Sequence, residues 1–131
     1  MALIKIYTEA DRLPELRQHV ARSIKLVGAA ALNVPDFETT PGSVETVYGE
    51  GLDLIGIDYI CEIIGVERPK EQDISDDFIR GLNTIYPEKL FSAYFVHIKE
   101  SGMSNTPRQR SSAEPITMDE AISLARENLS V

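Results

Sequence analysis

The sequence contains no tryptophan, a single cysteine and only two histidines among its 131 residues. One cysteine excludes a disulfide within the chain, and His19 and His97 are too far apart in the sequence to form a metal-ligand motif. We interpret Cys61, which lies within an apolar run, as a small buried hydrophobe rather than a reactive thiol. We interpret His97, which has apolar neighbours, as a packing or surface residue. We therefore expect neither a metal nor a cofactor.

Basic residues and long apolar runs are also scarce. The chain has 13 Lys and Arg against 21 Asp and Glu, a net charge of −8, and no basic stripe interleaved with aromatic residues. We therefore expect no nucleic-acid partner. No apolar run approaches the ~20 residues that a membrane helix needs, and the N-terminus leads into a strand pattern instead of a signal peptide. These features predict a cytoplasmic protein with no membrane partner.

A β-branched and aromatic run over residues 55–64 is typical of a strand that is covered on both faces. We predict it to be central in a sheet. A short turn with two cations follows, and Ser75 is then predicted to cap a helix that ends before Pro87. Further strands are predicted at residues 3–7, 43–48 and 91–98, and an amphipathic helix is predicted between the first two of these.

The predicted order is β-α-β-β-α-β, in which residues 3–48 and residues 55–98 each form one strand-helix-strand half. Such crossovers imply parallel pairing within each half. We therefore predict an α/β (α+β) fold with a four-stranded sheet and two helices on one face. The bare second face would need a cover, so we expect a homo-oligomer. At 131 residues with 43% hydrophobic content, the chain can bury a hydrophobic core of its own. We therefore predict a single domain, 1–131, in which residues 1–98 form the two strand-helix-strand halves.

Residues 99–131 form a C-terminal extension to this core. Residues 99–115 have the composition of a loop, rich in Ser, Gly, Asn, Pro, Gln and Arg. Thr117 and Glu120 then have the spacing of a capping box, which predicts a short final helix. We expect this tail to pack, either on its own core or on a neighbouring subunit.

Four places together resemble the tautomerase superfamily, in particular the group of 4-oxalocrotonate tautomerase and malonate semialdehyde decarboxylase. They are the strand at the very start of the chain, Asn33-Val34-Pro35 after the first helix, Glu67–Gln72 before the second, and the closing strand before a tail. The resemblance covers residues 1 to about 100. It implies a trimer with active sites near each N-terminus that act on small 2-oxo, enol or unsaturated carboxylic acids.

The chemistry of that family uses an N-terminal proline, and the matching position here is Ala2. Removal of the initiator methionine would leave a primary amine on Ala2, with a reference pKa of about 7.7 to 8.0 that an apolar pocket would lower. Such an amine can transfer protons or form a Schiff base with a carbonyl substrate. If Met1 is retained, the Ala2 nitrogen is an amide without basicity.

The resemblance also assigns substrate-binding positions. Arg68 and Lys70 match the basic pair that binds the substrate carboxylate, and Arg68 is the stronger candidate because its planar fork can make two parallel hydrogen bonds. The alternative is that both cations pair with acidic neighbours at the surface. The family's acidic partner falls on Asp36 or Glu38, each of which is otherwise a turn former in a proline-containing loop.

Two functions remain open. The first is a tautomerase-like isomerase or lyase that acts on a small anionic carboxylic acid, with Ala2 and Arg68 as its catalytic residues. The second is a noncatalytic oligomeric protein of the same fold that has lost the proline chemistry and at most binds a small anion. A third interpretation is an unrelated ferredoxin-like fold, such as a dimeric α/β-barrel protein, since strand-helix-strand doubling is shared by unrelated folds.

Overall fold

The structure is a computed structural model that describes residues 2–34, 44–49, 54–99 and 114–129. Its elements follow the predicted β-α-β-β-α-β order, and one further helix follows them. In chain order they are β1 (Ala2–Tyr7), a 3-10 turn (Ala10–Arg12), α1 (Leu13–Glu15), a π-helical turn (Leu16–Val20), α2 (Ala21–Leu32), β2 (Val44–Gly49), β3 (Tyr59–Gly65), α3 (Glu71–Ile85), β4 (Phe91–His97) and α4 (Met118–Leu129).

The four strands form one sheet in the order β2-β1-β3-β4. β1 pairs in parallel with β2, and β3 pairs in parallel with β4, whereas β1 and β3 are antiparallel. This confirms the parallel pairing expected within each half and the interior position of β3. The two halves meet at the antiparallel β1–β3 pair, so both of these strands have a neighbour on each side.

The prediction that the central strand begins at Ile55 is wrong. Ile55 is 89% exposed, and Ile55 and Gly56 both have positive φ values, of 50° and 85°. The Ile57 N–H donates to the Leu54 carbonyl at 3.2 Å, which closes a turn there. The apolar, β-branched run therefore continues from this turn into the strand, so the apolar pattern does not reveal where the turn ends. Because of the turn, β3 begins only at Tyr59.

The prediction of Ser75 as a helix cap is also wrong. α3 begins at Glu71, five residues before the start that a Ser75 cap implies, and follows Lys70, whose backbone is left-handed (φ 59°, ψ 39°). Glu71 and Asp73 stand in its first turn, where carboxylates interact favourably with the helix dipole. Ile74 adds one more turn to the apolar stripe that includes Phe78 and Leu82, so the helix gains buried contacts by starting early.

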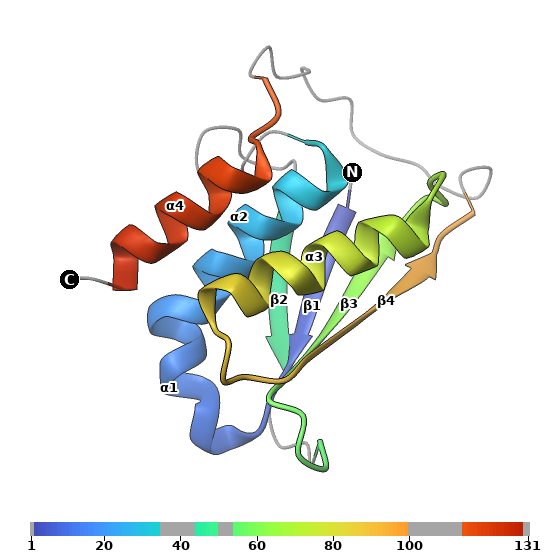
Figure 1. Ribbon diagram of the computed structural model, residues 1–131. Coiled ribbons are helices and arrows are strands. Elements are labelled where there is room, and N and C mark those ends of the chain that lie inside the picture. Colours follow the sequence, from blue (N-terminus) through green and yellow to red (C-terminus); the bar gives the residue numbers. More distant parts are fainter. Residues whose placement is uncertain (1, 35–43, 50–53, 100–113, 130–131) are drawn as a thin grey trace.

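The hydrophobic core lies between the sheet and a helical layer. Figure 1 shows α2 and α3 side by side across one face of the sheet, with α4 next to α2. Alternate residues of β1 and β3 point into this core, and they meet apolar residues of α2 and α3. The fully buried ones include Ile4, Ile6, Tyr59, Cys61, Ile24, Val27, Phe78 and Leu82. The two predicted helices therefore cover one face, as expected, and Cys61 is the buried hydrophobe predicted for it.

Helix α4 packs on α2 and α3 of its own chain. The Glu120 N–H donates to the Thr117 hydroxyl at 3.2 Å, which confirms the predicted capping residue. A Cβ atom at Gly81 would lie 2.7 Å from the Met118 Sδ and 2.8 Å from the Val27 Cγ1. The absence of a side chain at Gly81 is therefore what lets α4 approach α3. None of the helices in the described ranges is long and apolar enough to span a membrane.

The other face of the sheet has no helix over it in the described part of the chain. At its centre Tyr94 donates to Glu62 at 2.6 Å, and Lys5 lies 5.1 Å from the centroid of the Tyr7 ring. Val47 and Val96 on this face are 46% and 39% exposed. Apolar side chains are thus exposed on this face of the described sheet, and the cover expected for it stays a prediction.

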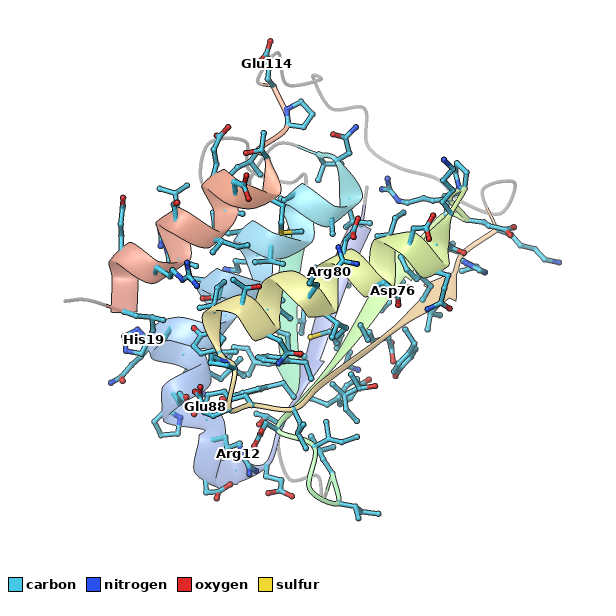
Figure 2. All side chains as sticks on the ribbon, viewed as in Figure 1. Arg12, His19, Asp76, Arg80, Glu88 and Glu114 are labelled. Atoms are coloured by element: carbon cyan, nitrogen blue, oxygen red, sulfur yellow. The ribbon has the colours of Figure 1, made fainter. Side chains whose placement is uncertain are left out.

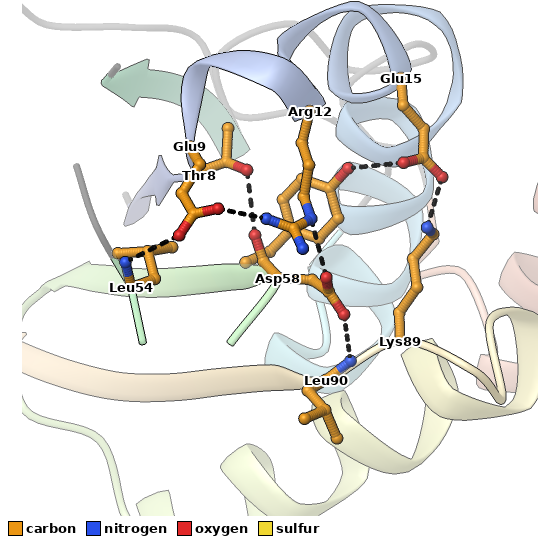
Figure 3. Close-up of polar contacts among 9 residues, drawn as sticks. Thr8, Glu9, Arg12, Glu15, Leu54, Asp58, Lys89 and Leu90 are labelled. Carbon is orange, nitrogen blue, oxygen red and sulfur yellow. Dashed lines mark hydrogen bonds and ion pairs between the residues drawn. The ribbon is translucent and has the colours of Figure 1, made fainter. Parts of the chain in front are cut away.

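A polar network joins three connections at the end of the sheet where β1 finishes (Figure 3). The Asp58 carboxylate accepts from the Arg12 Nε at 2.8 Å and from the Leu90 N–H at 2.8 Å. The Thr8 hydroxyl donates to the Asp58 carbonyl at 3.0 Å. Arg12 also pairs with Glu9 at 2.7 Å. Asp58 therefore ties the segment after β1 to the segment before β4.

Glu15 extends this network toward the helical layer. Its carboxylate accepts from the Tyr59 hydroxyl at 3.2 Å and pairs with the Lys89 Nζ at 2.6 Å. Burial, followed by the nearby Glu15 carboxylate, raises the pKa of Tyr59 above its ordinary value. Since its charged groups are matched to one another, we interpret this end of the sheet as structural.

Candidate functional site

The start of β1 lies at the opposite end of the sheet from the Asp58 network. There the register places Ala2 opposite Gly65, the last residue of β3, and Gly65 opposite His97, the last residue of β4. On the other side Ala2 stands opposite Val44 of β2. Neighbouring strands lie about 4.8 Å apart, so Ala2 and His97 are about 10 Å apart across the row. The active site that the family resemblance implies near the N-terminus would lie at this end of the sheet.

Ala2 is only 2% exposed and belongs to the hydrophobic core cluster. Its side chain is on the helix-covered face, in the same alternation as Ile4 and Ile6. Its surroundings are thus apolar, which is the environment in which an amine has a lowered pKa.

Arg68 and Lys70 lie in the connection that leads from Gly65 to α3. Arg68 is half-buried and Lys70 is exposed. Neither side chain forms a hydrogen bond or an ion pair with any residue in the described ranges, so the surface pairing with Glu67, Glu71 or Asp73 is not seen. The two cations are therefore open to an anionic ligand.

The left-handed backbone of Lys70 is a second notable feature of this connection. A positive φ is uncommon for a residue that is not glycine, and it costs of order 1 kcal/mol or more. Here it turns the chain sharply from the end of β3 into α3. The consequence is that Arg68 and Lys70 stand directly before the first turn of a helix, whose free N–H groups favour anions.

Glu71 and His97 form a contact that the sequence analysis did not predict. The His97 Nε2 lies 2.6 Å and 2.9 Å from the two oxygens of the Glu71 carboxylate. The sequence pattern predicts a packing or surface role for His97. Its side chain is 45% exposed and that of Glu71 only 18%. The pairing depends on the end of β4 reaching the first residue of α3, and no local pattern signals that.

The structure therefore brings together three of the predicted site residues, Ala2, Arg68 and Lys70, at one end of the sheet. The other two, Asp36 and Glu38, lie outside the described residues. No group of three or more His, Cys, Asp or Glu side chains placed to hold a metal ion occurs in the described part of the chain.

A separate cavity of about 440 Å³ lies on the outer side of the helical layer, between α2, α3 and α4. Its lining includes small and apolar residues such as Ala30, Gly81 and Met118. Arg80, which also lines it, pairs with Asp77 at 2.9 Å. Because Arg80 already has an acidic partner, the cavity offers less to an anion than the connection that carries Arg68.

The chain matches no protein-family profile and no curated protein. It does resemble solved structures. One is malonate semialdehyde decarboxylase, studied as wild type, mutant and inactivated enzyme, with a TM-score of 0.53 and 12% identity over 82% of this chain and 92% of that one. Another is N1, a member of the cis-3-chloroacrylic acid dehalogenase family, with a TM-score of 0.50 and 15% identity over 98% and 99%.

Both of these proteins belong to the tautomerase superfamily. The element order and the mixed four-stranded sheet match theirs, so the protein has the tautomerase fold. The alternative of an unrelated ferredoxin-like fold is therefore wrong. At 12% and 15% identity, these similarities concern the fold alone.

Proposed function

We propose that this tautomerase-fold protein is an isomerase or lyase that acts on a small 2-oxo, enol or unsaturated carboxylic acid. The observation that carries the proposal is the open basic connection: Arg68 and Lys70 follow Gly65, the strand partner of Ala2, and have no ion-pair partner in the described ranges. The similar solved structures include a decarboxylase of malonate semialdehyde and a relative of a chloroacrylic acid dehalogenase, and both substrates are small carboxylic acids or their aldehydes.

Arg68 would hold the substrate carboxylate. A guanidinium can donate two parallel hydrogen bonds to a carboxylate, and each such charged hydrogen bond contributes about 1.5–3 kcal/mol. Lys70 adds a second positive charge from the surface, and its flexible stem lets the ammonium follow the ligand. Because the chain has a net charge of −8, an anion is attracted only by a local positive potential, and the two cations of this connection supply one. Asp36 and Glu38 are proposed to orient the substrate or a water molecule.

Ala2 is proposed to contribute its amine when the initiator methionine has been removed. The apolar surroundings of Ala2 would lower the pKa of that amine and so raise its neutral, basic fraction. A neutral amine can accept a proton from the substrate or attack its carbonyl carbon.

A second candidate is a noncatalytic protein that binds a small anion. It is favoured by the same burial, since Ala2 packs in the hydrophobic core as an ordinary strand residue. In that case Arg68 still binds the carboxylate, but no proton is transferred.

We also propose a homo-oligomer, with a trimer as the expected state and the cytoplasm as its location. The bare sheet face supports the homo-oligomer, because a second subunit could cover its exposed apolar side chains. Val47, Tyr94 and Val96 on this face are 46%, 42% and 39% exposed. Sedimentation analysis tests the assembly: a trimer is expected, and a monomer at micromolar concentration would contradict it.

The function is tested by the ketonisation of phenylenolpyruvate, followed by ultraviolet absorbance. Wild type should accelerate the reaction, and Arg68→Ala should raise KM by about 10- to 100-fold, the equivalent of about one charged hydrogen bond. Lys70→Ala should have a smaller effect. Arg80→Ala is the matched control, because Arg80 lies on α3 about 14 Å along the helix from its first residue (Figure 2).

Three results decide between the candidates. Intact mass shows whether Met1 is present, and a retained Met1 removes the amine from the mechanism. Binding of phenylpyruvate that is lost in Arg68→Ala, without any rate enhancement by wild type, supports the noncatalytic protein. Equal KM values for wild type and Arg68→Ala would refute the role of the basic connection.

A further inference from the structure

We propose that His97, held in place by Glu71, is an acid–base catalyst of this site. The inference rests on the function proposed above and names a proton-transfer group that does not depend on the N-terminal amine. It follows from where the sheet register puts His97, from the contact with Glu71 and from the open cations beside them.

The location comes first. His97 ends β4 in the same row of the sheet as Ala2 and Gly65. Alternate residues of β4, from Phe91 to His97, point to the helix-covered side. Their β3 partners there are buried, namely Tyr59, Cys61 and Ile63. His97 is thus on the same side of the sheet as the Ala2 side chain. Between these two positions in the row stands Gly65, from which the connection that carries Arg68 starts.

The geometry of the pair fixes the imidazole. Both carboxylate oxygens of Glu71 lie within hydrogen-bond distance of the His97 Nε2, at 2.6 and 2.9 Å. A carboxylate only accepts, so Nε2 must carry the hydrogen and the neutral ring keeps its lone pair on Nδ1. No other residue in the described ranges forms a hydrogen bond with this ring, and 45% of the side chain is exposed. Nδ1 is therefore available to a substrate.

The surrounding charges suit an anionic substrate. Glu71 is the first residue of α3, three residues after Arg68 and directly after Lys70. While the His97 ring is neutral, the pair with the Glu71 carboxylate carries one negative charge, which the two open cations outweigh. The pair becomes neutral when the ring accepts a proton.

The reaction balances with this one residue. Nδ1 accepts the proton of the enol hydroxyl, the O–H bond breaks, and the oxygen forms the carbonyl as the C=C pair moves to the neighbouring carbon. The protonated ring then returns the same proton to that carbon, where a C–H bond forms. Arg68 stabilises the enolate between the two transfers, and no other reactant is consumed.

The test uses the same ketonisation assay with four variants. His97→Gln should lower kcat by about 100-fold or more and leave KM within about threefold, because the carboxylate site is intact. Glu71→Gln should lower kcat less, by about 10-fold, and Glu71→Asp should recover part of the loss since it restores the carboxylate. His19→Gln is the matched control: it removes the other histidine, which lies on the side of the molecule away from β4 (Figure 2), and should leave kcat unchanged.

The tautomer gives a readout that does not depend on activity. In long-range ¹H–¹⁵N spectra the ring of His97, assigned with His19→Gln, should show the Nε2–H form, and Glu71→Gln should weaken that preference. An Nδ1–H form would overturn the inference. Circular dichroism and thermal melting check that each variant is folded, and His97→Asn serves as a second variant.

The outcomes separate the two proposals. If wild type is active and His97→Gln and His97→Asn retain its kcat, the inference is wrong and the proposed function stands. If wild type does not accelerate the reaction, the proposed function is wrong and the acid–base role of His97 falls with it.

Discussion

Replacement of Asp58 by asparagine tests whether the network at the far end of the sheet holds the fold together. The Asp58 carboxylate uses one oxygen for the Arg12 Nε and the other for the Leu90 N–H, both at 2.8 Å. An asparagine has a single acceptor oxygen, and its amide group carries two hydrogens. One of the two donors must therefore face another donor in Asp58→Asn.

The magnitude follows from which partner is lost. A hydrogen bond to a charged group contributes about 1.5–3 kcal/mol, and a buried N–H left without an acceptor costs about 1–3 kcal/mol. The side chains of Asp58 and Arg12 are only 17% and 28% exposed, so solvent screening weakens the pair little. We expect Asp58→Asn to lower the free energy of unfolding by about 2–3 kcal/mol.

Urea denaturation followed by circular dichroism measures this difference, and a loss of this size should lower the midpoint by about 1 M. The matched control is Asp77→Asn, which also removes an aspartate from an arginine. The Asp77–Arg80 pair is 52% and 73% exposed, so this variant should lose no more than about 0.5 kcal/mol. Equal unfolding free energies for the two variants would refute the argument that the Asp58 network is structural.

Three further predictions concern buried or paired polar groups. Ser23 and Tyr86 share a buried hydrogen bond of 2.8 Å, and the Ser23 hydroxyl also donates to the His19 carbonyl at 3.3 Å. Ser23→Ala leaves the buried Tyr86 hydroxyl without this partner, whereas in Tyr86→Phe the Ser23 hydroxyl keeps the His19 carbonyl. Ser23→Ala should therefore lower the unfolding free energy by about 1–2 kcal/mol, more than Tyr86→Phe does. Equal losses in urea denaturation would contradict this. Burial raises the pKa of Cys61 to about 12, so a thiol reagent at pH 8 should react far more slowly with the folded protein than with protein unfolded in urea; equal rates would show that the thiol is accessible. The hydrogen bond to Glu62 raises the pKa of Tyr94 to about 12, so its stabilising effect is complete below pH 10 and is lost as the pH rises through about 12. In an ultraviolet titration of the folded protein, Glu62→Gln should move the ionisation of one tyrosine to lower pH, and an unchanged titration curve would contradict this pairing.

The candidate site was predictable only in part. Arg68 and Lys70 were identified because they resemble a family motif, and they follow β3, whose last residue pairs with Ala2. Their binding role stays a prediction. The Glu71–His97 pair was missed because its residues lie 26 positions apart, and each has an ordinary local explanation. Glu71 counts as an acidic residue in a first helical turn, and His97 as the end of a strand. Only the parallel packing of β4 beside β3, with α3 above them, brings their side chains together.

The order of the elements, the parallel pairing within each half and the cap at Thr117 can all be predicted from the amino-acid pattern. They depend on apolar periodicity and on contacts between residues a few positions apart, which leave a pattern in the chain. The starts of β3 at Tyr59 and of α3 at Glu71 cannot be predicted in this way. Both boundaries depend on residues distant in sequence. The Leu90 N–H donates to the Asp58 carboxylate directly before β3, and Ile74 in the first turns of α3 packs against the hydrophobic core. A local pattern states what a segment can form, and the energy of contacts distant in sequence decides where that segment begins and which side chains meet there.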